Sequence, residues 1–222
     1  MNKSYKFIDN QDGKPRAVAK ENINAGTMIM SEKPLFSLAA NELSVVHIKA
    51  CLDRLNPAQV RQVLTLPNPH ALNIKIDPLF SAFTTHALPQ GPSHERSELP
   101  QRYGLFPYIA HFGHSCRPNV NHSWNAVTGE ERLYATRAIT RGEELAICRA
   151  NFFDDRKERQ RFLFKEYGLS CSCSVCSLQG DALEQSNWRR RELRSLYDDI
   201  DRKGAYPQEA IQMVSAYIFC VN

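Results

Sequence analysis

Residues 112–119 read Phe-Gly-His-Ser-Cys-Arg-Pro-Asn, and this octapeptide is the part of the chain that decides its fold. Two more signatures follow it in order: Ala138-Ile139 before Gly142-Glu143-Glu144-Leu145, and then Cys171-x-Cys173-x-x-Cys176. The last of the three has a chemistry that follows from its residue types alone.

The three cysteines at positions 171–176 are close enough in the sequence to bind one metal ion from a tight turn. Zinc prefers four ligands in a tetrahedron, so three local thiolates require a fourth ligand from elsewhere in the chain. A site closed by four thiolates is structural, because no position is left for water or substrate. It would fix the C-terminal part onto the body of the domain. The fourth ligand stays open among Cys51, Cys116, Cys148, Cys220 and the histidines.

The composition is that of an ordinary domain. A length of 222 residues fits one domain, or one domain with a small appendage, and 42% apolar residues suffice for a core. A net charge of +4, without a dense basic run beside aromatic residues, makes nucleic acid an unexpected partner. The most basic stretch, Arg189-Arg190-Arg191 with Arg194, is interpreted as the solvated face of a helix, with a binding patch as the alternative.

The sequence contains no hydrophobic run of signal-peptide or membrane-spanning length. We therefore expect a soluble intracellular protein, in the cytoplasm or in the nucleus. In a reducing compartment the seven cysteines are expected to be thiols or metal ligands rather than disulfides.

Hydrophobic periodicity predicts a β-rich chain with helices in its middle and at its C-terminal end. Strands are expected at 5–8, 16–19 and 27–30, and again between 105 and 149, where Thr128-Gly129 marks a hairpin. Helices are expected at 43–55, 57–66, 78–83, 154–167, 181–202 and 206–219, and residues 88–102 are expected to form an exposed loop.

The three signatures, together with Ala25-Gly26-Thr27 and Pro34-Leu35-Phe36, resemble the SET family over about residues 5–178. That family contains protein lysine methyltransferases that use S-adenosylmethionine. The chain is most similar to the compact fungal branch related to the SET-and-MYND proteins, without a MYND zinc module. The resemblance implies a mainly β fold (a β-clip with a pseudo-knot) that carries a helical insert, a post-SET zinc site and C-terminal helices.

The resemblance also implies boundaries and metal ligands. The expected parts are N-terminal SET strands at 1–39, a helical insert at 40–104, a C-terminal SET part with the pseudo-knot at 105–153, a post-SET zinc segment at 154–178 and a helical tail at 179–222. In this family the cysteine of the His-Ser-Cys string completes the zinc site. The implied ligands of one structural zinc ion are therefore Cys116, Cys171, Cys173 and Cys176.

The positions at which the family holds S-adenosylmethionine correspond here to Gly13, Arg16, Gly113 and His114. The family's glycine-rich loop lets the backbone approach the cofactor. In this chain Pro15 removes an N–H from that loop and Ala17 adds a Cβ. The family's asparagine before His-Ser-Cys has become Gly113, which has no side chain to offer. These departures predict weakened binding of S-adenosylmethionine.

The family's catalytic tyrosine aligns with Arg149. Methyl transfer to lysine requires a neutral amine aligned with the sulfonium methyl in a narrow channel, beside a positioned hydroxyl. A permanent guanidinium cation repels both the sulfonium and a lysine ammonium, which in a partly buried site costs several kcal/mol. Other possible sources of a hydroxyl are Tyr103 and Tyr167, and Tyr167, just before the cysteine triplet, is expected to line the cleft.

These departures predict that lysine methylation has been lost and that the cleft has a new use. The first hypothesis is a cofactor-independent cyclase of the pericyclase or Diels-Alderase type, acting on a hydrophobic polyene-carbonyl intermediate of natural-product biosynthesis. Its expected catalytic residues are Arg149, Tyr103 and His111, with Arg149 polarising the carbonyl. The alternatives are an S-adenosylmethionine-dependent methyltransferase with a protein lysine as its substrate, and a non-catalytic peptide-binding pseudoenzyme.

Overall fold

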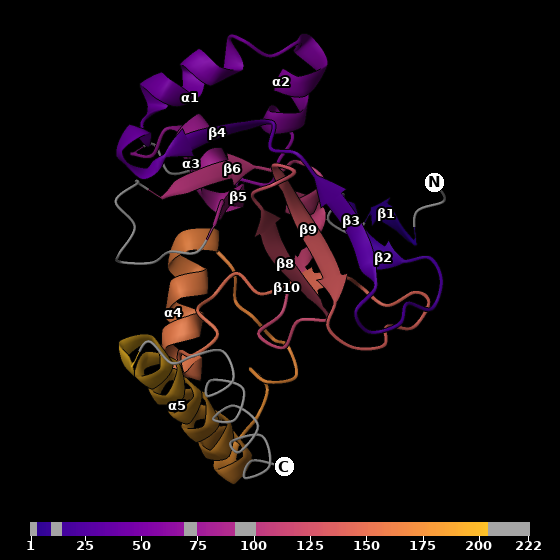
Figure 1. The fold of residues 1–222 in the computed structure, drawn as a ribbon, viewed down its shortest axis with the longest axis vertical. Helices are drawn as coiled ribbons and strands as arrows, with labels where there is room; N and C mark the ends of the chain where they lie inside the picture. The colour runs from indigo at the N-terminus through magenta and orange to yellow at the C-terminus, as the bar shows by residue number, and fades with distance from the viewer. Residues whose placement is uncertain (1–3, 10–14, 69–74, 92–100, 204–222) are drawn as a thin grey trace.

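A computed structural model describes residues 4–9, 15–68, 75–91 and 101–203 of the chain (Figure 1). Gly13, expected in the cofactor loop, and the helix expected at 206–219 therefore lie outside the described residues. No helix within the described ranges is both long and apolar enough to span a bilayer.

The β part consists of small sheets rather than one continuous sheet. The strands confirm a mainly β fold with helices inserted and appended. In the described part of the chain, β1 (Tyr5–Asp9) pairs with β2 (Pro15–Ala19), and β7 (Gly113–His114) pairs in parallel with β10 (Ala146–Ile147). One three-stranded sheet has the order β3-β9-β8, formed by β3 (Met28–Glu32), β9 (Glu130–Ala135) and β8 (Val120–Asn125). A second has the order β4-β6-β5, formed by β4 (Phe36–Ala39), β6 (Arg102–Leu105) and β5 (Ala87–Pro89).

The hairpin between β8 and β9 forms at the predicted turn. The side chain of Asn125 accepts hydrogen bonds from the backbone N–H groups of Val127 and Thr128 at 3.0 and 3.1 Å. Gly129 has φ +65°, a left-handed conformation that glycine adopts without steric cost. Alternate residues of β9 then point into the core, so the register of this sheet is fixed by burial.

Helices α1 (Val45–Leu52), α2 (Pro57–Leu64) and α3 (Pro78–His86) pack with the β4-β6-β5 sheet at one end of the molecule (Figure 1). Side chains of Ser44, Asn56 and Asp77 cap their N-termini, and proline occupies the first position of α2 and α3. The shared core consists of Leu38, Ile48, Leu52, Val63, Leu66, Phe83, Leu105 and Ala110.

Two details of the insert differ from the sequence pattern. Val46, an apolar residue within the helix expected at 43–55, is 74% exposed, because the helix directs Ile48 and Leu52 inward instead. The stretch expected to be an exposed loop contributes strands at both of its ends, since β5 and β6 pair with each other. Short strands of three or four residues give too little alternation to be recognised in a sequence rich in Pro and Ser.

Helices α4 (Arg156–Tyr167) and α5 (Gly180–Lys203) lie side by side at the end of the molecule opposite α1 and α2 (Figure 1). Asp155 caps α4 by accepting from the backbone N–H of Glu158 at 2.9 Å. Gly168 ends the helix with φ +58°, and its N–H bonds back to the last turn. This turn directs the chain from α4 straight into the cysteine triplet.

Candidate functional site

The site is built where residues 112–119 lie beside residues 143–149. The backbone N–H of Gly113 donates to the carbonyl oxygen of Leu145 at 3.0 Å, and that of Ser115 donates to Ile147 at 3.1 Å. This parallel pairing of β7 with β10 brings together segments that are about thirty residues apart in the chain. His114 and Arg149 thereby become neighbours.

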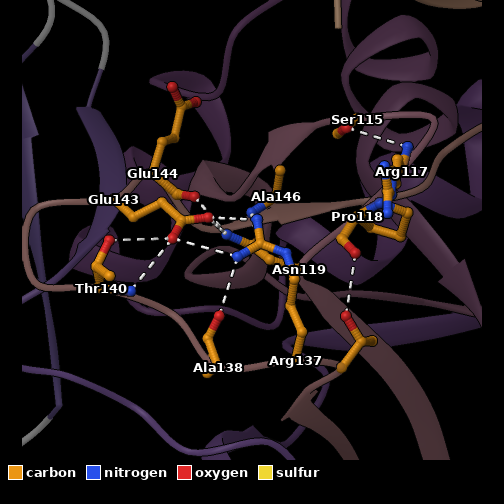
Figure 2. A network of polar contacts seen from close by, with 11 residues as sticks. Ser115, Arg117, Pro118, Asn119, Arg137, Ala138, Thr140, Glu143, Glu144 and Ala146 are labelled. Atoms are coloured by element: carbon orange, nitrogen blue, oxygen red, sulfur yellow. Dashed lines mark hydrogen bonds and ion pairs between the residues drawn. The ribbon is translucent and has the colours of Figure 1, made fainter. Parts of the chain in front are cut away.

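Asn119 holds this crossing together through a buried polar network (Figure 2). Its amide nitrogen donates to Oε1 of Glu143 at 2.9 Å and to the carbonyl oxygen of Glu144 at 2.8 Å, and its amide oxygen accepts from the N–H of Ala146 at 2.9 Å. The Arg137 guanidinium, which also donates to Glu143, lowers the pKa of that carboxyl to about 2. Asn119 is only 4% exposed, so every polar group of this side chain must be paired within the protein.

A first cavity of about 640 Å³ opens beside the crossing, and we call it cavity 1. It brings together Arg16, His111, Gly113, His114 and Arg149, which were expected at the site from the sequence. It does not include Tyr103. Its lining is formed by Pro15, Arg16, Pro67, Thr85, His86, residues 110–115, Glu144, Ala146, Arg149, Tyr167 and residues 169–173.

A second cavity of about 390 Å³, cavity 2, lies against the helical insert and contains Tyr103. Arg149 and Tyr167 line both cavities, so these two side chains form the junction between them. Tyr103 and His111 line different cavities and are not brought together. The lining of cavity 2 is formed by Leu43, Phe83, Thr84, Ala87, Leu88, Pro89, Tyr103, His122, Cys148, Arg149 and Tyr167.

The Arg149 side chain is held by the backbone of the octapeptide region. Its Nη2 donates to the carbonyl oxygens of Phe112 at 3.4 Å and of Ala110 at 3.5 Å, and its guanidinium carbon lies 5.8 Å from the ring centre of Tyr167. Within the described ranges it forms no ion pair with an acidic side chain. Burial accordingly lowers the pKa of Arg149.

Because Gly113 has no side chain, the Glu144 carboxylate can lie where the family has an asparagine side chain. A Cβ at residue 113 would lie 2.4 Å from Oε1 of Glu144, so any larger residue there would displace this carboxylate. Glu144 also forms an exposed ion pair with Arg16, another residue lining cavity 1, at 3.1 Å. Cavity 1 therefore lacks the asparagine side chain that the family has at this position, and the Glu144 carboxylate lies there instead.

Two histidines add unpartnered nitrogen atoms to cavity 1. Nε2 of His86 donates to the carbonyl oxygen of Pro67 at 2.6 Å, which leaves Nδ1 of the neutral ring as an acceptor. That Nδ1 and Nδ1 of His111 are buried and have no hydrogen-bond partner among the described residues. Burial lowers the pKa of both rings, and the Arg149 cation helps to lower that of His86 to about 4.

The depressed pKa of His86 predicts a specific loss of stability in acid. Below its usual pKa of 6.5 the unfolded chain gains a proton that the folded chain refuses until about pH 4, so falling pH favours unfolding across this window. The free energy of unfolding should fall by roughly 3 kcal/mol more between pH 7 and pH 4 than in His86→Asn. Urea titrations at both pH values measure this, with His47→Asn on the exposed side of α1 as the control. Equal pH slopes for wild type and His86→Asn would contradict the assignment.

The four grouped cysteines form a compact thiol cluster. The sulfur atoms of Cys116, Cys171, Cys173 and Cys176 all lie within 4.8 Å of one another. Ligands 2.3 Å from a tetrahedral zinc ion are about 3.8 Å apart, so this cluster could hold one zinc ion with small adjustments. Gln160 on α4 fixes the approach of the triplet by hydrogen-bonding both the N–H and the carbonyl oxygen of Cys171.

Two guanidinium groups surround the cluster. Arg159 is 0% exposed and donates to Sγ of Cys176 at 3.9 Å, and Arg190 of α5 donates to the carbonyl oxygen of Cys116 at 3.0 Å. Four thiolates around Zn²⁺ carry a net charge of about −2, which these two cations would balance. The prediction of a solvated face for 189–191 is therefore wrong at Arg190, which is 6% exposed.

The comparison with known families matches the SET domain model to residues 17–148, which is more than half of the chain. The chain belongs to the SET-domain family. This SET-domain chain is 26% identical over 194 residues to histone-lysine N-methyltransferase set5 of Schizosaccharomyces pombe, covering 87% of this chain and 57% of that protein. Over 76 residues it is 37% identical to human histone-lysine N-methyltransferase SMYD3, which is 34% of this chain and 17% of SMYD3. The SET-domain chain thus spans 57% of the length of its fission-yeast relative.

The family confirms the resemblance and the fold that it implied, but the expected cyclase is wrong. The relatives are named histone-lysine N-methyltransferases, and none of these names indicates cyclisation or a hydrophobic natural-product substrate. One amino group of Arg149 is already bound to backbone carbonyls rather than free to polarise a substrate. The expected weakening of S-adenosylmethionine binding also finds no support in this family.

The sequence places Tyr167 at the cleft, and the structure shows in addition that it forms the junction of the two cavities with Arg149. Glu144 belongs to a motif in the sequence, but its carboxylate, which occupies the space left by Gly113, is not predicted as part of the site. The glycine itself was the available signal, because a missing side chain leaves room for a neighbour.

Proposed function

We propose that this protein is an S-adenosylmethionine-dependent protein lysine methyltransferase that binds the cofactor in cavity 1 and admits the lysine side chain through cavity 2. The observation that carries the proposal is the pair of cavities meeting at Arg149 and Tyr167. Methyl transfer requires donor and acceptor to enter from separate sides and meet in line. The names of the SET-domain relatives support the same activity.

The residues of cavity 1 fit S-adenosylmethionine, which supplies an electrophilic methyl group on a sulfonium when bound. A volume of about 640 Å³ is within the usual range for ligand cavities. The Glu144 carboxylate can accept from the ammonium of the cofactor, and Nδ1 of His86 is a buried acceptor that needs a donor. Arg16 can pair with a carboxylate.

The residues of cavity 2 suit the aliphatic part of a lysine. Leu43, Phe83 and Leu88 give it apolar walls that exclude water from the methylene groups. The Tyr167 phenol stands at the junction, where a hydroxyl can orient the lone pair of a neutral amine. Burial raises the pKa of Tyr167, so the phenol stays protonated at neutral pH.

We also infer that the four-cysteine cluster holds a structural zinc ion. Its geometry supports this role, and four thiolates leave no open position for catalysis. The zinc segment carries Tyr167 and residues 169–173, which line cavity 1. Zinc would thus act indirectly, by positioning one side of the cofactor site.

Tyr167→Phe is expected to reduce methyl transfer by roughly 10–100-fold, because it removes the hydroxyl that orients the amine. The assay follows tritiated methyl from S-adenosylmethionine into histone and other lysine-rich protein acceptors, with the product lysine identified by mass spectrometry. Tyr197→Phe on α5, which is exposed, is the matched control and should retain wild-type transfer. Absence of lysine-bound label with the wild-type protein would contradict the proposed function, and undiminished transfer by Tyr167→Phe would remove the phenol from the mechanism.

A further inference from the structure

The lysine that enters cavity 2 has to lose a proton before it can accept a methyl group. A lysine side chain is an ammonium at neutral pH, and an ammonium has no lone pair with which to attack. The Tyr167 phenol can orient an amine, but burial raises its pKa and keeps it protonated, so the phenol does not take up the proton. The transfer therefore needs a proton acceptor in cavity 2.

His122 of β8 lines cavity 2 and pairs with a carboxylate of the neighbouring strand. It lies opposite Leu133 of β9, and Glu131 lies two residues before Leu133, on the same face of the sheet. Nδ1 of His122 is 2.9 Å from Oε1 of Glu131. Because a carboxylate can only accept a hydrogen bond, Nδ1 carries the hydrogen and Nε2 keeps a lone pair. Within the described ranges no group hydrogen-bonds to Nε2.

Glu131 is 0% exposed, which is unusual for a carboxylate with so few hydrogen-bond donors. Its Oε2 is buried without a partner among the described residues, and its neighbours on this face are Trp124 and Leu133. Burial of such a group is strongly unfavourable, and an apolar residue of similar size would fill the same space at a lower cost. The one feature that accounts for a carboxylate here is the His122 ring, whose protonated form it would stabilise.

We propose that Nε2 of His122 is the base that removes the proton from the lysine ammonium, while Glu131 holds the ring and stabilises the imidazolium. The inference rests on the proposed function. The Nζ–H bond breaks as the proton passes to Nε2, and the lone pair left on Nζ forms the N–CH₃ bond as the S–CH₃ bond breaks. The proton then leaves to water, which the His122 side chain can reach because it is 22% exposed.

The other titratable side chains of cavity 2 do not compete for this role; they are Tyr103, Cys148, Arg149 and Tyr167. Phenols and thiols carry a proton at neutral pH, and burial raises the pKa of Cys148 and Tyr167 further. The Arg149 cation opposes a proton on the lysine and on His122 alike, so it does not set the direction of the transfer. Glu131 does, because its carboxylate is bonded to the His122 ring.

His122→Asn is the decisive variant, because its side-chain amide can still donate to Glu131 but has no atom in place of Nε2. The assay measures kcat for transfer of tritiated methyl to the protein acceptor that the wild-type chain labels best, at saturation. At pH 7 the variant should lose about 100-fold in kcat. At pH 9.5 roughly a tenth of the lysine is neutral without help, so the loss should shrink to about tenfold or less. His47→Asn, exposed on α1, should match the wild type at both pH values.

A second variant tests the carboxylate. Glu131→Gln keeps an oxygen that can accept from Nδ1 but removes the charge, and it should lower kcat by about tenfold at pH 7 with KM unchanged. An unchanged kcat would exclude Glu131 from this role. Calorimetric titration with S-adenosylhomocysteine shows for each variant whether cavity 1 is intact.

Two results with His122→Asn would overturn the inference alone: full transfer at pH 7, or the same loss at pH 7 and pH 9.5. The wild-type protein decides independently of how any variant folds. With an internal base its kcat should rise by less than about threefold per pH unit from pH 7.5 to pH 9.5, whereas a rise of about tenfold per unit would mean that no residue takes the proton. Absence of lysine-bound label from the wild-type protein would overturn the proposed function together with the inference.

Discussion

Cys116→Ser is expected to produce the largest loss of stability of any single change considered for this chain. It removes one of the four sulfur atoms that lie within 4.8 Å of one another and so opens the inferred zinc site. Structural zinc sites contribute about 10 kcal/mol or more to the folding of small zinc domains. A loss of about 5 kcal/mol here would lower the melting temperature by roughly 10–20 °C.

The change is measured as zinc content per chain together with the thermal midpoint. Chelation of zinc from the wild-type protein should reproduce both effects. Cys51→Ser is the matched control, because this partly buried cysteine lies in the helical insert outside the cluster and should keep its zinc. A Cys116→Ser protein with a full zinc content and an unchanged midpoint would show that the cluster is not a metal site.

Asn119→Ala is expected to cost about 3 kcal/mol of stability. The side chain makes three hydrogen bonds across the crossing of the two segments, at 2.8–2.9 Å (Figure 2). Alanine would leave the N–H of Ala146 and the carbonyl oxygen of Glu144 buried without this partner, and each unsatisfied group costs about 1–3 kcal/mol. Denaturant titration at pH 7 gives the difference in free energy of unfolding.

An exposed asparagine provides the comparison for this prediction. The side chain of Asn22 accepts one hydrogen bond from the N–H of Arg141 at 2.9 Å, at the surface. Asn22→Ala should cost roughly 0.5 kcal/mol, since water replaces the lost bond. If Asn119→Ala were no more damaging than Asn22→Ala, the network would have no special role in holding the crossing.

The parts of the fold that the sequence revealed are those encoded by local patterns. Alternating residues at 16–19 and 27–30 and a polar turn at Thr128-Gly129 specify strands and a hairpin without reference to the rest of the chain. The cysteine triplet is equally local, because its three thiols share one turn. Helix α4 was recognisable over nearly its full length for the same reason.

The electrostatic environment of the site could not be predicted, because it depends on partners far apart in the chain. Arg149 was recognised as a departure, but its hydrogen bonds to Ala110 and Phe112 join residues 37 to 39 positions away. Arg190 reaches the carbonyl of Cys116 over 74 positions, so its burial contradicts the helical pattern around it. The sequence identifies Arg149 and Arg190 as cations, whereas only the fold determines which groups surround them.

The central claim is that cavity 1 remains a site for S-adenosylmethionine despite the changes at Gly113 and Arg149. Its most direct test is a calorimetric titration of the zinc-loaded chain with S-adenosylmethionine at pH 7. We predict saturable binding of one molecule per chain that S-adenosylhomocysteine abolishes by competition. The absence of saturable heat with either nucleoside at millimolar concentration would contradict the claim.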